Sequence, residues 1–364
     1  VGSEMCIRDR SLFMATIQIQ NIGPIVDTGV IELRAINLFI GKQSSGKSTL
    51  LKILCFCRWI DKQVAIGSRK KDKSASYVYS HYSRFIKELM HFYRFNESFF
   101  TAQSQIHYNG DAVEITFKGD TKNNAQIAAK AKGDKYNSKL CFIPSERNLL
   151  SAIKNIQDGY RSSDMDMLFN FVFEWSEFRE KFTPDNRLRL TVAPDMEYYY
   201  DKESGEQIII HKNNRQVPPF SPFYASSGVQ SALPLEVLLR SLVNTIGQNA
   251  KLSQSDLTQI VARLLRDGAT VEQVQRAIEA GHEESRKLLT YQGIQLFIEE
   301  PEQNLFPESQ AAIINSIVRA VKEAESKSAH HRNMVVMTTH SPYVLSSLNV
   351  LMACLLYTSP SPRD

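Results

Sequence analysis

The chain has 364 residues, of which 43% are hydrophobic and 23% charged, a composition typical of a globular protein of one large or two modest domains. Its formal net charge of +4 permits contact with nucleic acid without requiring it. No apolar run approaches the roughly 20 residues that a membrane-spanning helix needs, so we expect a cytoplasmic protein with no membrane span.

The two ends of the chain do not resemble the ends of a folded domain. Residues 1–13 begin with VGSEMCIRD, and residues 353–364 include CLLYTSPSPRD. Both resemble translated adapter sequence, which should be excluded from reasoning about the fold. We therefore expect two artefacts, a native start at Met14, and a native C-terminal portion that is missing after about Met352.

The first predicted unit is rich in β-structure and ends in a phosphate-binding loop. Alternating or apolar residues predict strands at 16–20, 30–33 and 36–40. After the last of these, a glycine, four residues and Gly-Lys-Ser match the P-loop motif, and a helical pattern follows at 49–59. Because strand, loop and helix come in the expected order, the sequence predicts a nucleoside triphosphate site.

Each residue type in this loop has a physical reason. Gly41 and Gly46 let the backbone approach phosphate oxygens, and the amides that follow point inward at a helix N-terminus with partial positive charge. We expect Lys47 to reach the β- and γ-phosphates and the Ser48 hydroxyl to bind Mg²⁺. The predicted ATP-binding residues are Gly41, Lys42, Gln43, Ser44, Ser45, Gly46, Lys47, Ser48 and Thr49.

Residues 61–139 are expected to form an insertion arm on this core. A basic and polar run at 68–76 and an aromatic helix at 77–100 come first, and an Asn-Gly turn within 108–117 predicts a hairpin. The basic and aromatic content leaves two interpretations open. Composition favours a solvated surface arm over a contact with nucleic acid.

A short apolar strand at 140–143 ends in polar residues, where nucleotide-sensing loops of doubly wound sheets lie. Glu146 and Arg147 are therefore candidates for contact with the γ-phosphate or its water shell. A cap for the following helix explains them equally well. A helix at 164–182 and strands at 187–192, 196–200 and 207–211 are predicted to follow.

The stretch YASSGVQSALP, at 224–234, opens another helix with serines and a glycine. Such an amide-exposing helix start suits a phosphate, although an ordinary N-cap is the commoner explanation for one taken alone. The long segment 233–291 keeps helical spacing, for example at Leu257, Ile260 and Val261. We expect a helical insertion that serves as a lever, a partner surface or a packed subdomain.

Two later strands end in residues that suit hydrolysis. The apolar strand 294–298 ends in Glu299 and Glu300, at the edge of a buried sheet where ligands bind. We expect Glu299 to hold Mg²⁺ through water and Glu300 to orient or deprotonate the attacking water. The stretch MVVMTTHSP, at 334–342, is an apolar strand that ends near His340, which is expected to donate a hydrogen bond to the γ-phosphate.

Together, GKQSSGKST, SSGVQ, IEEPEQNLFP and TTHSPYVLSSLN resemble the ABC-type ATPase core of the OLD and RecF-like group of AAA ATPases, relatives of the SMC proteins. The resemblance covers residues 14–352 and implies an α/β P-loop fold of ABC-ATPase type, a mixed sheet flanked by helices with a helical insertion. It implies that 41–49 are Walker A, Glu299 and Glu300 Walker B, and His340 the switch histidine. It further implies a signature motif that closes over the partner's γ-phosphate, formed by Ser226, Ser227, Gly228 and Gln230.

The activity implied by this resemblance is hydrolysis of ATP with Mg²⁺ by a homodimer, in DNA repair or anti-phage defence, with Lys47, Glu300 and His340 as catalytic residues. DNA or a nuclease or effector subunit is the implied partner. Two alternatives remain: the nucleotide-binding subunit of a transporter, against which the long gap before Walker B argues, and a scaffold that binds ATP and barely hydrolyses it. Glu299 stands where many ABC ATPases have Asp, and no glutamine loop can be placed.

Overall fold

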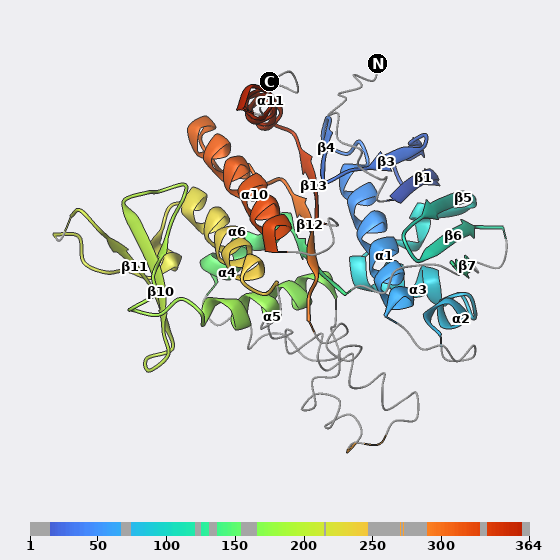
Figure 1. Ribbon diagram of the computed structural model, residues 1–364. Helices are drawn as coiled ribbons and strands as arrows, with labels where there is room; N and C mark the ends of the chain where they lie inside the picture. Colours follow the sequence, from blue (N-terminus) through green and yellow to red (C-terminus); the bar gives the residue numbers. More distant parts are fainter. Residues whose placement is uncertain are drawn as a thin grey trace, which may run out of the picture.

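The computed structural model describes residues 15–66, 74–120, 125–130, 137–153, 166–214, 216–246, 270, 272, 290–327 and 333–358. In these residues a parallel sheet and a larger antiparallel sheet enclose helix α1 (Lys47–Ala65), and further helices cover the other face of the parallel sheet (Figure 1). The α/β class expected from the sequence is confirmed. The mixed sheet that the resemblance implies is divided into separate parallel and antiparallel sheets.

The parallel sheet has the strand order β4-β13-β12-β8, and every neighbouring pair is parallel. Its strands are β4 (Ile36–Ile40), β8 (Ser138–Ile143), β12 (Gly293–Glu299) and β13 (Met334–Thr339). Because parallel strands end at the same edge, the four loops that follow them lie side by side. These loops carry the P-loop, residues 144–147, the glutamate pair and the late histidine.

Alternation along the strands sends neighbouring side chains into two different cores. On β12, Leu296 and Ile298 face one hydrophobic core, whereas Phe297 faces the other, which includes α1. Burial on both faces explains why the parallel strands read as nearly continuous apolar runs. The antiparallel side therefore shares its core with the P-loop helix.

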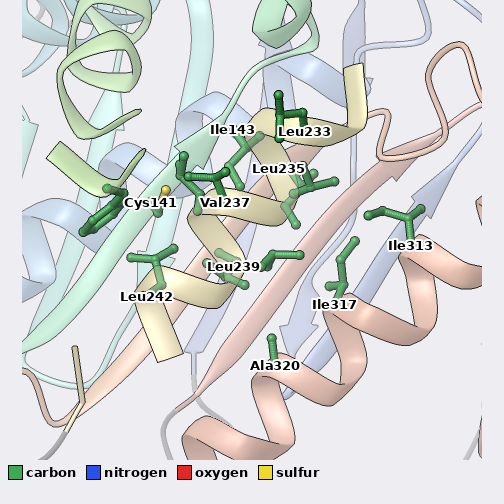
Figure 2. Packing of buried hydrophobic residues seen from close by; sticks show 14 of the residues in the cluster. Cys141, Ile143, Leu233, Leu235, Val237, Leu239, Leu242, Ile313, Ile317 and Ala320 are labelled. Atoms are coloured by element: carbon green, nitrogen blue, oxygen red, sulfur yellow. The ribbon is translucent and has the colours of Figure 1, made fainter. Parts of the chain in front are cut away.

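The opposite face of the parallel sheet is covered by α5 (Met167–Arg179), α6 (Ser227–Val243) and α10 (Pro307–Lys327). Figure 2 shows apolar side chains of α6 lying between those of β8 and α10. The helix α11 (Pro342–Thr358) follows β13 and contacts α10. Thus α1 and α6 lie on opposite faces of one sheet.

The antiparallel sheet has the order β2-β1-β5-β6-β7, with β3 also paired to β1. The strands β5, β6 and β7 come from residues 61–139, so this segment is integral to the sheet. The predicted hairpin is confirmed, since Asn109 on β5 pairs with Glu114 on β6. The bounds are β1 (Ala15–Ile22), β2 (Ile25–Asp27), β3 (Ile31–Leu33), β5 (Phe100–Asn109), β6 (Val113–Lys118) and β7 (Ala125–Ala129), with the short helices α2 (Ala75–Tyr79) and α3 (Arg84–Tyr93) beside them.

A third, three-stranded antiparallel sheet has the order β11-β10-β9. It consists of β9 (Leu188–Arg189), β10 (Met196–Asp201) and β11 (Glu206–His211), close to the three predicted strands. Short helices complete the described elements: η2 (Glu97–Phe99), η3 (Ser145–Asn148), α4 (Leu149–Ala152) and η5 (Pro222–Tyr224).

Several predictions fall on residues outside the described ranges. Residues 1–13 lie outside them, and so does most of the predicted helical insertion, at 247–269 and 273–289. The first part of that insertion, 233–243, forms the second half of α6. Among the described residues, no helix combines the length and the apolar character needed to cross a bilayer.

A buried arginine ties α1 to both large sheets. Nε of Arg58 donates to Oε1 of Gln295 on β12 at 2.8 Å. Its Nη1 donates to Oδ2 of Asp61 at 3.0 Å, to the Tyr108 hydroxyl at 3.1 Å and to Oδ2 of Asp111 at 3.0 Å. The carboxylate of Asp61 also accepts the backbone N–H of Asp111. These contacts fix the P-loop helix against β12 and against the turn between β5 and β6.

We expect Arg58→Met to lower the free energy of unfolding by roughly 3–5 kcal/mol, because Asp61 and Asp111 would lose their buried cation. Urea unfolding followed by circular dichroism measures this. The matched control is Arg34→Met, since Arg34 pairs with Glu32 at 3.6 Å and both side chains are about half exposed. The control should change stability by less than about 0.5 kcal/mol. Equal effects of the two substitutions would contradict a structural role for the buried network.

Candidate active site

The loops at the carboxyl edge of the parallel sheet are joined by backbone hydrogen bonds. The N–H of Gly41, after β4, donates to the carbonyl of Thr339 at the end of β13 at 3.4 Å. The N–H of Glu300, after β12, donates to the carbonyl of Thr338 at 2.9 Å. The P-loop, the glutamate pair and the histidine segment are therefore held in one row by main-chain geometry.

The P-loop leads into α1 at Gly46, where the backbone conformation and the close packing favour a residue without a side chain. Gly46 is the N-cap of α1 at φ 92°, and a Cβ there would come within 2.6 Å of Ile25 Cγ1. Residues 42–45 and Ser48 are exposed, whereas Lys47 is partly buried. Residues 42–45 of the loop are thus exposed to solvent, whereas Gly46 packs against Ile25 of the antiparallel sheet.

The ammonium group of Lys47 folds back over the loop. Its Nζ donates to the carbonyl of Gly41 at 2.9 Å and to that of Lys42 at 2.6 Å. Partial burial lowers the pKa of Lys47, and the charges of Glu300 and Glu302 oppose this shift. The cation is therefore placed beside acidic groups from another loop.

His340 connects the glutamate pair to the P-loop. Its Nε2 lies 3.0 Å from Oε1 of Glu300, and its Nδ1 lies 3.0 Å from the Gly41 carbonyl and 3.4 Å from Nζ of Lys47. A carboxylate can only accept, so this contact is a hydrogen bond in the tautomer that carries a proton on Nε2. The structure thus brings together Lys47, Glu300 and His340, the three residues predicted to be catalytic.

A third glutamate, which the sequence reasoning missed, fixes the backbone at His340. Oε1 of Glu302, a buried residue, accepts the hydroxyl of Thr339 at 2.5 Å and the N–H of His340 at 2.9 Å. The only sequence signal for it is the third acidic residue in the stretch IEEPEQ. A buried carboxylate that accepts two hydrogen bonds from one loop holds that loop in place.

Glu299 is buried at the end of β12. Its Oε2 accepts the N–H of Ser145 at 3.2 Å and the Ser145 hydroxyl at 3.4 Å, whereas Oε1 has no hydrogen-bond partner among the described residues. An unpartnered carboxylate oxygen suits Mg²⁺ or its water, so the residue fits its predicted role. Ser48, the other predicted ligand, is exposed in the first turn of α1. No cluster of three or more acidic, His or Cys metal-ligand candidates occurs in the described part of the chain.

The predicted contact of Arg147 with a γ-phosphate is not supported. The guanidinium is fully buried, and all three of its nitrogens donate to backbone carbonyls, those of Pro144, Ser231, Glu299 and Glu300. Burial lowers the pKa of Arg147 to about 10, against the opposing charges of nearby glutamates. Arg147 therefore points into the protein. Glu146 is exposed and accepts the Ser145 hydroxyl at 3.1 Å, so its predicted role stays a prediction.

The predicted signature residues lie at the start of α6. Ser226 is its N-cap, and both Ser226 and Ser227 are exposed. Gly228 packs so closely on the loop after β12 that a Cβ would come within 2.9 Å of the Asn304 carbonyl. Nε2 of Gln230 donates to the carbonyl of Phe223 at 2.9 Å. This stretch contacts the loop after β12, on the face of the sheet opposite to α1.

No family model matches the chain, and no curated protein matches it. Among solved structures, it is similar to an SMC head bound to the C-winged helix domain of ScpA, with 10% identity, 91% of this chain and 90% of that chain covered, and a TM-score of 0.37. It is also similar to the SMC head domain from Thermotoga maritima, with 9% identity, the same coverages of 91% and 90%, and a TM-score of 0.38. What the geometry defines by itself is an α/β protein whose P-loop stands beside an acidic pair and a histidine.

Two left-handed glycines provide a test of the P-loop packing. Gly46 and Gly205 have φ of 92° and 72°, but of the two only Gly46 has atoms within 4 Å of the position that an added Cβ would take. We expect Gly205→Ala to cost about 1 kcal/mol of unfolding free energy from backbone strain. Gly46→Ala should cost a further 1–3 kcal/mol or so, because the methyl would overlap Ile25. Urea unfolding of both variants measures the difference, and equal losses would contradict the close packing of the loop.

Proposed function

We propose that this chain is an ATP-binding and ATP-hydrolysing head domain of the ABC type that dimerises around ATP. The observation that supports this most directly is the chain of contacts from Lys47 to His340 to Glu300. Lys47 and His340 are 293 positions apart in the sequence, and each of the three residues belongs to a different motif. Chance matches to short motifs would not be expected to meet at one edge of one sheet.

Binding would rest on the exposed P-loop. The amides of residues 41–49 and the ammonium of Lys47 would hold the phosphates of ATP. In the structure, Lys47 donates to two neutral carbonyls. Anionic phosphate oxygens are stronger acceptors, so the ammonium would exchange these carbonyls for the nucleotide. Mg²⁺, held by Ser48 and Glu299, would neutralise charge on the phosphates.

Hydrolysis would rest on Glu300 and His340. The carboxylate of Glu300 would orient the attacking water and accept its proton. In the structure Nε2 of His340 faces Glu300, and an N–H group makes one strong hydrogen bond at a time. We infer that His340 shifts this hydrogen bond to the γ-phosphate during turnover, while Glu302 keeps its backbone in place.

The position of the predicted signature residues supports the proposed dimer. The helices α6 and α1 cover opposite faces of the sheet, and Ser226 and Ser227 at the start of α6 are exposed. They would contact the nucleotide of a second copy.

As the resemblance implies, the process served would be DNA repair or anti-phage defence, with DNA or a nuclease or effector subunit as partner.

We expect Lys47→Ala to weaken ATP binding by at least about 100-fold, the equivalent of roughly two charge-assisted hydrogen bonds. Titration with a fluorescent ATP analogue measures the Kd. Lys87→Ala is the control, because Lys87 is an exposed lysine on α3. Unchanged affinity in Lys47→Ala would overturn the site assignment.

Glu300→Gln tests turnover separately from binding. We expect kcat to fall roughly 10²–10⁴-fold with ATP affinity retained, because the amide cannot accept a proton. Light scattering after size-exclusion chromatography should show a dimer that persists with ATP in the variant. If the wild type hydrolyses ATP no faster than the variant, the scaffold alternative is correct and the proposed ATPase activity is not.

A further inference from the structure

The guanidinium of Arg147 joins three segments of the active-site edge. Its Nη1 donates to the carbonyl of Pro144, after β8, at 3.2 Å and to that of Glu299 at 2.8 Å. Its Nη2 donates to the carbonyl of Glu300 at 2.6 Å, and its Nε donates to that of Ser231 on α6 at 3.0 Å. One buried side chain therefore contacts the ends of two parallel strands and the helix that begins with the predicted signature residues.

Only an arginine can make this set of contacts. The guanidinium is a planar fork whose three nitrogens point in fixed, different directions, whereas a lysine carries a single point charge. Keeping a cation in the interior is unfavourable unless its donors are satisfied. The four carbonyls provide that satisfaction, and the same bonds hold the carbonyls in fixed directions.

The contact with Glu300 bears on chemistry because the backbone there is unusual. Glu300 has φ of 43°, a left-handed conformation that costs a non-glycine residue about 1–2 kcal/mol. Its N–H is held by the Thr338 carbonyl at 2.9 Å, and its own carbonyl is held by Arg147. With both peptide groups held, the direction in which the side chain leaves the backbone is set, and its carboxylate lies 3.0 Å from Nε2 of His340.

The contact with Ser231 extends this arrangement to α6. Besides the carbonyl bond to Arg147, the Ser231 hydroxyl accepts a hydrogen bond from Nδ2 of Asn304 at 2.9 Å. Asn304 belongs to the loop after β12 and also touches Gly228 closely. Two contacts thus connect the first turns of α6 to the loop after β12. The Ser231 carbonyl is connected to it through Arg147, and the Ser231 hydroxyl through Asn304.

We propose that Arg147 is a positioning residue that couples the orientation of Glu300 to the position of helix α6. A displacement at the start of α6 is transmitted through the guanidinium to the Glu300 carbonyl and changes the direction of its carboxylate. The proposal rests on the proposed function, since it assigns Glu300 a role in hydrolysis. It assigns no contact between Arg147 and nucleotide.

The test uses Arg147→Lys and Arg147→Met in the full chain, with Arg240→Met as a control on the exposed side of α6. We expect both Arg147 variants to lower kcat by about 100-fold, the effect of a displacement of about 1 Å, with the Kd for ATP changed less than about threefold. Arg147→Lys should not retain more activity than Arg147→Met, because a single ammonium group cannot replace the three donor nitrogens of the guanidinium. Arg240→Met should leave both constants unchanged.

A double-mutant cycle separates this role from general support of the fold. If Arg147 acts through Glu300, adding Arg147→Lys to Glu300→Gln should lower kcat no further. If the two substitutions lower kcat by factors that multiply, or if Arg147→Lys also weakens ATP binding, the coupling is overturned while the proposed ATPase activity stands. Failure of both Arg147 variants to fold would also overturn it, in favour of a purely structural role. A wild type without ATPase activity would overturn the proposed function and this coupling together.

Discussion

The parallel pairing of β4 with β13 is the constraint on which the site depends. The register places Thr339 opposite Ile40, so the P-loop and the histidine segment leave the sheet at the same level. The pairing of β13 with β12 then places Glu299 opposite Thr338. Backbone hydrogen bonds of the sheet, rather than contacts between the active-site side chains, therefore determine which residues meet.

Buried polar groups then stabilise an edge that the sheet alone would leave loose. Loops at the ends of parallel strands leave carbonyl and N–H groups without ladder partners, and such groups must be satisfied when they are buried. Arg147 satisfies four carbonyls, and Glu302 satisfies the Thr339 hydroxyl and the His340 N–H. Both side chains are buried, so the loops at this edge are held more firmly than exposed loops usually are.

Two buried arginines connect β12 to the helices on its two faces. Arg58 joins it to α1 through Gln295, within the strand. Arg147 joins it to α6 through the carbonyls at its carboxyl end. The strand that carries the acidic pair is consequently fixed to the P-loop helix on one side and to the helix with the predicted signature residues on the other. The helices on the two faces of the sheet are thus both bonded to one strand.

The sequence by itself determined many of the local elements: the four strands of the parallel sheet, the P-loop and its helix, the hairpin at Asn109, and the residues that end each parallel strand. These follow from side-chain alternation, glycine spacing and turn chemistry, which are properties of neighbouring residues. Only the tertiary structure decided that β5 pairs with β1 to bring residues 61–139 into a sheet, that Arg147 points inward, and that Glu302 holds the histidine loop. The reason is that strand pairing and the burial of a charged side chain depend on partners distant in the sequence, and a single sequence does not show which of them will meet.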